Sequence, residues 1–331
     1  MWEPIRLPSN RPADRFYLGG DRIAQFRGEP SQGPRTPEDW VGSTTSVRDA
    51  GPVGQTTLPD GSSLVEQVQR APEQWLGADH LAAFGIDTKL LVKLLDAGQR
   101  LPVHAHPSVG FASTHLGSSH GKAEAWYVLE PGEVYLGLRE DHSLAEVLEL
   151  VNRQATEDLL DAMHRVPVQV HQTVFVPPGM LHSIGEGILL VEVQEPEDLS
   201  ILLEWKGFEL DGAADGHLGL GFETALQAVE TRARTPLEVG ALLGSGSTDG
   251  EVLAAGSEAF FRLERLSAAS RPERAPSFAV VVVIDGSVDL ATASGAQVRA
   301  EAGSTLLVPY AAGALRLDGQ GNVVIARPPA P

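Results

Sequence analysis

The sequence predicts a mostly β protein made of two β-barrel lobes, with a small helical insertion in the first lobe. Short runs rich in Val, Ile, Phe and Tyr alternate with Gly- and Pro-containing turns, most regularly near the C-terminus. Residues 303–317 (GSTLLVPYAAGALRL) repeat the strand–turn–strand layout of residues 172–185 (QTVFVPPGMLHSIG), which indicates two related lobes. The clearest helical periodicity lies in residues 143–166.

The N-terminal third predicts loops, one broken helix and two strands. Residues 1–60 are rich in Pro, Gly and Asp, which is typical of loops with short strands. Residues 60–77 carry apolar side chains at helical intervals and predict a helix interrupted near Pro72. Residues 88–108 predict a strand, a turn at Asp96-Ala97-Gly98 and a second strand.

The middle of the chain predicts a hairpin, the helical insertion and further strands. In residues 122–138, two β-rich runs flank Pro131-Gly132, which favours a hairpin. Residues 143–166 predict a helix with Ser143 as N-cap and Glu146 in the capping-box position. Residues 172–194 predict strands around a Pro-Pro-Gly turn.

A change of composition divides the chain near residue 220. Residues 211–221 are rich in Gly, Asp and Ala, and a short helix is expected directly after them. A Gly- and Ser-rich linker follows at 244–250, and the remaining runs predict only short strands. We therefore predict a first lobe over 1–220, with an N-terminal extension, and a second lobe over 221–331. Only the first contains histidines.

Composition and charge exclude several classes of function. The longest apolar run, FAVVVVI (278–284), is far shorter than the roughly 20 residues of a membrane-spanning helix and predicts a buried strand. The sequence has no cysteine and opens without the layout of a signal peptide, so we expect a cytoplasmic protein that does not contact membranes. A formal net charge of −19 argues against nucleic-acid binding. A phosphorylated substrate would need a local positive pocket.

Four side chains in the first lobe suggest a metal site. His104 and His106 are one residue apart on a predicted strand, so their rings share one face. Glu124 follows on the next β-rich run, and His182 comes three residues after the Pro-Pro-Gly turn. Taken singly, each is more often a solvated side chain. Together, three imidazoles and a carboxylate suit zinc, and also other divalent transition metals.

The spacing Gly-x5-His-x-His, then Glu, then Pro-x-Gly-x2-His resembles the cupin signature. The segments YLGG, EDWVGSTTSV, LLVKLLDAGQRLPVHAHP, GKAEAWYVL and VFVPPGMLHSIGEGILLVEVQEPEDL are similar to class I mannose-6-phosphate isomerases of the short bacterial type. This resemblance covers nearly the whole chain in order. It implies a catalytic, zinc-binding cupin lobe of jelly-roll type with a helical insertion, a metal-free C-terminal cupin lobe, and aldose–ketose isomerase activity.

Two positions depart from the family pattern. The family typically has Gln-x-His where this chain has His104-Ala105-His106, so an imidazole replaces an amide oxygen. The family arginine that follows the E-x-Q strand falls on Leu202. Lys206 is a nearby cation, and we predict a catalytic role for it, although an ammonium lacks the two-pronged geometry of a guanidinium.

Further site residues are predicted from strand positions. Lys122 matches the lysine of the family's GK-x-E motif and lies two residues before the predicted ligand Glu124, so we expect it to act as acid or base. Glu192 is the predicted carboxylate base, with Glu204 as the alternative. Arg100 and Lys93 are expected to bind an anionic substrate.

The predicted function is therefore a metal-dependent isomerase acting on mannose-6-phosphate or a related sugar, as a monomer or weak homodimer. Two alternatives stay open at this point. One is a sugar-binding protein that has kept the metal and lost catalysis. The other is a cupin of oxidative type, since three histidines and one glutamate also occur as a ligand set in such enzymes.

Overall fold

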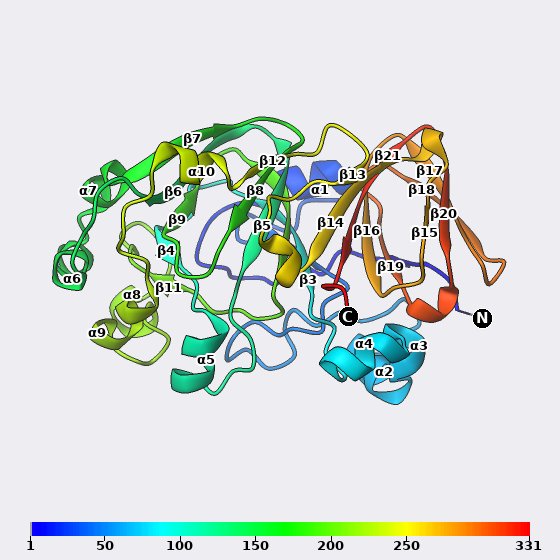
Figure 1. Ribbon diagram of the computed structural model, residues 1–331, viewed down its shortest axis with the longest axis horizontal. Helices are drawn as coiled ribbons and strands as arrows, with labels where there is room; N and C mark the ends of the chain where they lie inside the picture. Colours follow the sequence, from blue (N-terminus) through cyan, green and yellow to red (C-terminus); the bar gives the residue numbers. More distant parts are fainter. Residues whose placement is uncertain (1) are drawn as a thin grey trace.

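A computed structural model describes residues 2–331 and shows a largely β architecture (Figure 1). The strands are β1 (Ile5–Leu7), β2 (Glu38–Val41), β3 (Leu91–Asp96), β4 (His104–Ala105), β5 (Glu124–Glu130), β6 (Gly132–Leu138), β7 (Met163–Val168), β8 (Gln172–Val176), β9 (His182–Ile184), β10 (Leu189–Gln194), β11 (Ile201–Leu202), β12 (Leu243–Ser245), β13 (Gly250–Glu251), β14 (Arg262–Ser267), β15 (Glu273–Arg274), β16 (Ala279–Asp285), β17 (Ser287–Thr292), β18 (Gln297–Glu301), β19 (Thr305–Val308), β20 (Leu315–Gly319) and β21 (Asn322–Arg327).

The helices are short and lie around the sheets. They are α1 (Asp21–Arg27), α2 (Leu64–Arg70), α3 (Pro72–Leu76), α4 (Ala78–Phe84), α5 (Val109–His115), α6 (Leu144–Arg153), α7 (Thr156–Asp161), α8 (Gly212–Asp215), α9 (Phe222–Ala225) and α10 (Pro236–Gly240), with 3-10 turns η1 (Leu226–Ala228), η2 (Ser257–Ala259), η3 (Ala268–Ser270) and η4 (Tyr310–Ala312). Within residues 2–331, no helix combines the length and apolar character that crossing a bilayer requires.

Four antiparallel sheets form two pairs that lie side by side in Figure 1. The N-terminal sheet pair consists of the sheets β12-β8-β5-β10-β3-β2 and β11-β4-β9-β6-β7. The C-terminal sheet pair consists of β1-β19-β16-β21-β14-β13 and β15-β20-β17-β18. The mostly β prediction is therefore confirmed.

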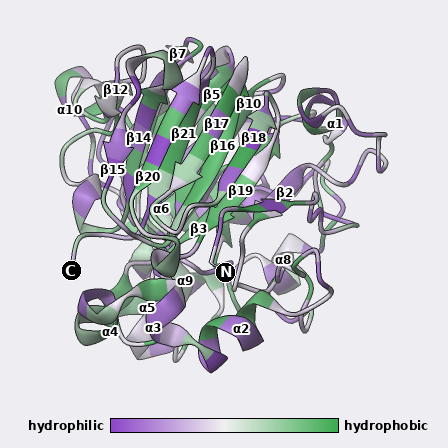
Figure 2. Ribbon diagram, turned by 90° about the vertical axis from the view of Figure 1, so that its right-hand side faces the viewer, coloured by the Kyte–Doolittle hydropathy of each residue, from purple (hydrophilic) through white to green (hydrophobic). Residues whose placement is uncertain are grey.

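The alternation of side chains along β3 explains how one sheet serves both a core and a site. Val92 and Leu94 are buried in a hydrophobic core that also contains Val280 and Val324 of the C-terminal sheet pair. Lys93 lies between them and therefore projects from the opposite face. Figure 2 shows hydrophobic residues along the long strands β16 and β21 and hydrophilic residues on peripheral helices such as α2.

The predicted hairpin at 122–138 is wrong. β5 pairs with β8 and β10, whereas β6 pairs with β7 and β9 in the other sheet, so the chain changes sheets at Pro131. Only this one residue separates the two strands. A tight hairpin needs a two-residue loop, and Pro131 alone cannot supply it.

The predicted helix at 143–166 is confirmed only in its first part. Ser143 caps α6, and Glu146 completes the capping box. A second helix, α7, follows, but residues 163–168 form the edge strand β7. Val166 precedes Pro167, and a residue before proline favours extended backbone, which agrees with the edge strand β7.

The other elements are largely as expected, with a few additions. The break near Pro72 separates α2 from α3, and the strands at 88–108, at 172–194 and in the C-terminal part are present. Helices α1, α4, α5, α8 and α10 were not predicted. The expected linker at 244–250 is partly strand, because β12 pairs with β8.

The lobe boundary at residue 220 stays a prediction, and two short strands cross it. β1 lies in the C-terminal sheet pair beside β19, and β12 lies in the N-terminal sheet pair.

Candidate functional site

Three of the predicted ligands form one buried cluster. His104 on β4 and His182 on β9 are directly opposite each other in the antiparallel ladder, and His106 follows β4. One ligand atom from each imidazole lies within 4.8 Å of the others. All three side chains are buried.

Backbone carbonyls fix the orientation of each imidazole. The Nδ1 atoms of His104, His106 and His182 lie 2.8, 2.7 and 2.8 Å from the carbonyl oxygens of Pro102, Leu199 and Met180. A carbonyl only accepts, so Nδ1 carries the proton in each ring and Nε2 presents a lone pair. This arrangement is typical of metal-binding histidines.

Glu124, at the start of β5, faces two of these lone pairs. Its Oε2 atom lies 2.9 Å from Nε2 of His106, and its Oε1 atom lies 3.2 Å from Nε2 of His182. The indole of Trp126 donates to Oε1 at 3.1 Å. The ammonium of Lys122 lies 2.7 Å from Oε2 and 2.8 Å from Nε2 of His106.

The electrostatics favour unprotonated imidazoles beside a carboxylate. Burial lowers the pKa of His104 well below its usual value, and the neighbouring His182 and His106 lower it further. Burial, with the ammonium of Lys122, lowers the pKa of His106 to about 3. Burial alone would raise the pKa of Glu124, but Lys122 and His106 bring it well below its ordinary range. The cluster therefore offers three neutral nitrogens and one anion.

These residues fit a divalent transition metal. The Nε2 atom of His182 is buried without a hydrogen-bond partner, which is costly unless a cation accepts its lone pair. Three nitrogens and a carboxylate suit zinc, and the same donors suit iron, manganese, cobalt or nickel.

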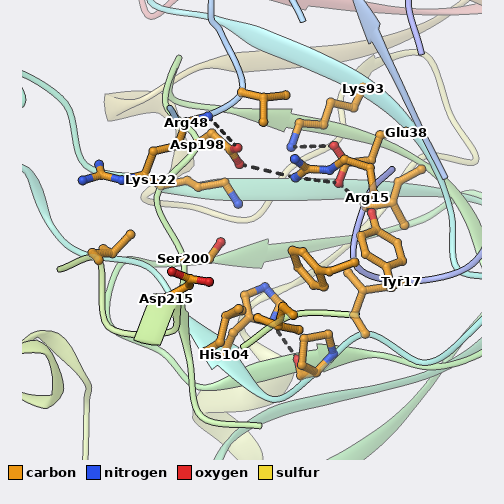
Figure 3. Close-up of a pocket in the computed structure, with 18 of the residues that line it drawn as sticks. Arg15, Tyr17, Glu38, Arg48, Lys93, His104, Lys122, Asp198, Ser200 and Asp215 are labelled. Atoms are coloured by element: carbon orange, nitrogen blue, oxygen red, sulfur yellow. Dashed lines mark hydrogen bonds and ion pairs between the residues drawn. The ribbon is translucent and has the colours of Figure 1, made fainter. Parts of the chain in front are cut away.

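A cavity of about 530 Å³ adjoins this cluster (Figure 3). His104, Glu124 and Lys122 line it together with Lys93 and Glu192. On β10, Glu192 is paired with Lys93 of β3 on one side, and Gln194, two residues on, is paired with Glu124. The alternation of strand side chains therefore places Glu192 and Glu124 on the same face.

A second buried carboxylate, Glu38, organises the far side of the cavity. It accepts from the Tyr17 hydroxyl at 2.7 Å and from the Trp40 indole at 2.6 Å. The guanidinium of Arg15 lies 3.4 Å away and the ammonium of Lys93 lies 3.8 Å away. Burial would raise the pKa of Glu38, but these two cations lower it to about 2.

Glu192 has a different environment. Burial raises its pKa, and the ammonium of Lys93, 3.2 Å away, only partly offsets this effect. Burial would lower the pKa of Lys93, but Glu38 and Glu192 raise it. The cavity thus contains one carboxylate held ionised and one with an increased affinity for a proton.

The structure brings most, but not all, of the predicted residues together. The cluster and cavity contain His104, His106, His182, Glu124, Lys122, Lys93 and Glu192. Arg100 and Lys206 instead line a separate surface hollow. The Arg100 guanidinium is paired with Glu204 at 2.8 Å, and Lys206 is exposed. Arg100 and Lys206 thus lie outside the cavity that adjoins the imidazole cluster, and their roles stay predictions.

Several cavity residues had no role in the sequence prediction. They are Arg15, Tyr17, Glu38, Arg48, Asp198, Ser200 and Asp215. Arg15, Tyr17 and Glu38 lie in or beside the segments YLGG and EDWVGSTTSV, which carried the resemblance without indicating a contact to the site. Leu202, at the position of the family arginine, does line the cavity.

Comparisons with known proteins agree with this architecture. The mannose-6-phosphate isomerase of Streptococcus mutans is 30% identical over 207 residues, which is 60% of this chain and 59% of that protein. The chain thus matches about three fifths of that relative's length. GmuF of Bacillus subtilis, to which the same activity is ascribed, is 26% identical over 333 residues, or 94% of this chain and 95% of GmuF. No family model matches the chain.

Solved structures show the same fold over the full length. The mannose 6-phosphate isomerase of Bacillus subtilis superposes with a TM-score of 0.75 at 22% identity, covering 98% of this chain and 99% of that one. A phosphomannose isomerase variant from Salmonella typhimurium gives 0.74 at 14% identity, covering 99% and 100%. The chain therefore has the fold of the mannose-6-phosphate isomerases.

Proposed function

We propose that the protein is a metal-dependent aldose–ketose isomerase for sugars of the mannose–fructose type. One observation carries the proposal: a buried set of three Nδ1-anchored imidazoles and Glu124 opens onto a cavity that also contains Lys122 and Glu192. The names of its relatives support the reaction class. On this proposal, the N-terminal sheet pair is the catalytic cupin lobe and the C-terminal sheet pair is the metal-free lobe.

His104, His106, His182 and Glu124 would hold the metal, and zinc fits these donors. When bound, a divalent cation supplies Lewis acidity that polarises the carbonyl of the sugar. The backbone carbonyls behind the imidazoles keep the lone pairs aimed at one point.

Glu192 and Lys122 would transfer the protons. Isomerisation moves the C2 proton of the aldose to C1 and the proton of the C2 hydroxyl to the C1 oxygen, so no atoms or electrons are gained or lost. Glu192, whose pKa is raised by burial, can accept the carbon-bound proton and return it. Lys122, whose ammonium lies beside Glu124 and His106, can donate to the sugar oxygens.

The proposal is tested with purified, zinc-loaded protein. Mannose-6-phosphate, fructose-6-phosphate, mannose and fructose are incubated separately, and the isomeric products are separated by chromatography. We expect His106→Ala to lose both bound metal and turnover, and Glu192→Gln to keep the metal and lose turnover. Absence of turnover on all four sugars by folded, metal-bound protein would contradict the proposal. Sugar binding without turnover would then favour the binding protein, and oxygen consumption by the iron-loaded form would favour the oxidative enzyme.

A further inference from the structure

We propose that the cavity selects an uncharged sugar over a sugar phosphate, and that Leu202 and Asp215 set this preference. The inference rests on the proposed isomerase function and names the substrate class of the same site. It starts from the charges that line the cavity, where four Lys and Arg side chains face six carboxylates.

Both buried lysines contact protein carboxylates, and the partner of Lys122 is the proposed metal ligand Glu124. Lys122 contacts Glu124 at 2.7 Å. Lys93 contacts Glu192 at 3.2 Å and Glu38 at 3.8 Å. A phosphate would have to compete with these fixed carboxylates, which already lie within contact distance.

Arg15 is paired as well, whereas Arg48 contacts only the exposed carboxylate of Asp49. Arg15 lies 3.4 Å from Glu38 and 3.7 Å from Asp198. Arg48 lies 3.5 Å from Asp49, and its side chain is 40% exposed at the mouth of the cavity. Among the described residues that line the cavity, no cation is both buried and unpaired.

The part of the cavity wall around Leu202 and Asp215 is apolar and acidic. Leu202, Leu210 and Leu218 line the cavity there. The backbone N–H of Leu202 donates to the carbonyl of Gly216 at 2.8 Å, which places Asp215 next to Leu202. Figure 3 shows the Asp215 carboxylate on the same side of the cavity as Ser200.

This wall suits hydroxyl groups and disfavours a phosphate. A dianion placed there would lose its hydration against leucine side chains and would meet the Asp215 carboxylate. Sugar hydroxyls can instead donate to Asp215 and Asp198, while the C–H faces of the sugar pack against Leu202 and Leu218.

The test compares kcat/KM for mannose and fructose with kcat/KM for their 6-phosphates. We expect the free sugars to be preferred by roughly a hundredfold, because a dianion has no unpaired buried cation to bind. The double variant Leu202→Arg/Asp215→Asn should narrow this ratio by about tenfold or more, because it adds a guanidinium and removes a carboxylate. Leu237→Arg is the matched control, since Leu237 is 84% exposed and outside the cavity, and it should leave the ratio unchanged.

A single variant and a binding measurement test the preference for uncharged sugars independently of the double variant. Asp215→Asn alone changes an exposed side chain and tests the acidic wall even where Leu202→Arg fails to fold. Calorimetry on the wild-type protein should show binding of mannose that inorganic phosphate does not displace. A preference for the 6-phosphates overturns the inference and leaves the isomerase proposal intact. Absence of turnover on every sugar overturns the isomerase proposal. The calorimetric comparison of mannose with inorganic phosphate then still decides whether the cavity prefers an uncharged sugar.

Discussion

The two sheet pairs have similar layouts and very different interiors. The C-terminal sheet pair encloses a core of apolar side chains, including Val281, Leu290 and Ile325. The N-terminal sheet pair encloses charged and polar groups, among them Lys93 and Glu192. Burying charge is costly unless it is paired, so the charged interior is explained by chemistry and the apolar one by stability.

The same difference between a polar and an apolar interior appears in the two segments with a strand–turn–strand layout, residues 172–185 and 303–317. After β8, a Pro-Pro-Gly turn leads to His182, a member of the ligand cluster. After β19, Pro309 leads into η4 and then β20, and residues 221–331 contain no histidine at all. A shared architecture can thus serve either as a site or as a packed support, depending on which side chains fill it.

The largest expected effect comes from putting a charge into the apolar interior. Val281→Asp should lower the free energy of unfolding by about 4 kcal/mol or more, because the new carboxylate would be buried without a partner. Chemical denaturation measures the loss. Val53→Asp is the matched control, since Val53 is 44% exposed and should tolerate the change. Similar stabilities for the two variants would show that the second interior is not packed as described.

Metal binding should stabilise only the charged interior. Zinc at about 1,000 times its Kd should raise the free energy of unfolding by about 4 kcal/mol, because it binds the folded ligand cluster and not the unfolded chain. His182→Ala should abolish the rise in thermal unfolding temperature, while His115→Ala, at an exposed position, should retain it. An equal rise in both variants would place the metal elsewhere.

Removing the buried cation of Lys93 should lower the free energy of unfolding slightly less. Lys93→Met should lower the free energy of unfolding by about 3 kcal/mol, because it leaves Glu38 and Glu192 without their shared cation. Adding Glu192→Gln should recover part of this loss. Denaturation of the two single variants and the double variant gives the coupling energy, and simple additivity would rule out the proposed pairing.

The smallest effect is a pH dependence from His120, which lies in the loop between α5 and β5. The hydrogen bond to Asp87, at 2.6 Å, and the nearby Glu197 raise the pKa of His120 to about 9, although burial and Lys89 oppose this rise. The stabilisation is therefore complete below about pH 6.5 and is lost as the pH rises towards 9, with a size of about 1–3 kcal/mol. Stability curves should lose this slope in His120→Gln. An unchanged slope would assign it to another group.

The cluster of three imidazoles was predictable because short motifs carry its members on or beside strands. His104 and His106 share a face by alternation, and the turn before His182 identifies the third imidazole. Arg15 and Glu38 were not predictable as cavity residues, because they lie in or after long loops whose path no local pattern fixes. The position of Lys206 outside the cavity was not predictable, because the end of β11 at Leu202 depends on tertiary packing.

The exchange of β1 and β12 between the sheet pairs has a consequence for how this chain can be divided. Residues 5–7 complete a sheet built mainly from residues after 250, and residues 243–245 complete a sheet built from residues before 195. A cut at residue 220 would leave each fragment with an uncovered strand edge and without one of its own strands. The two halves are thus interlocked. A chimaera that replaces the C-terminal half with that of a relative must also replace the N-terminal segment.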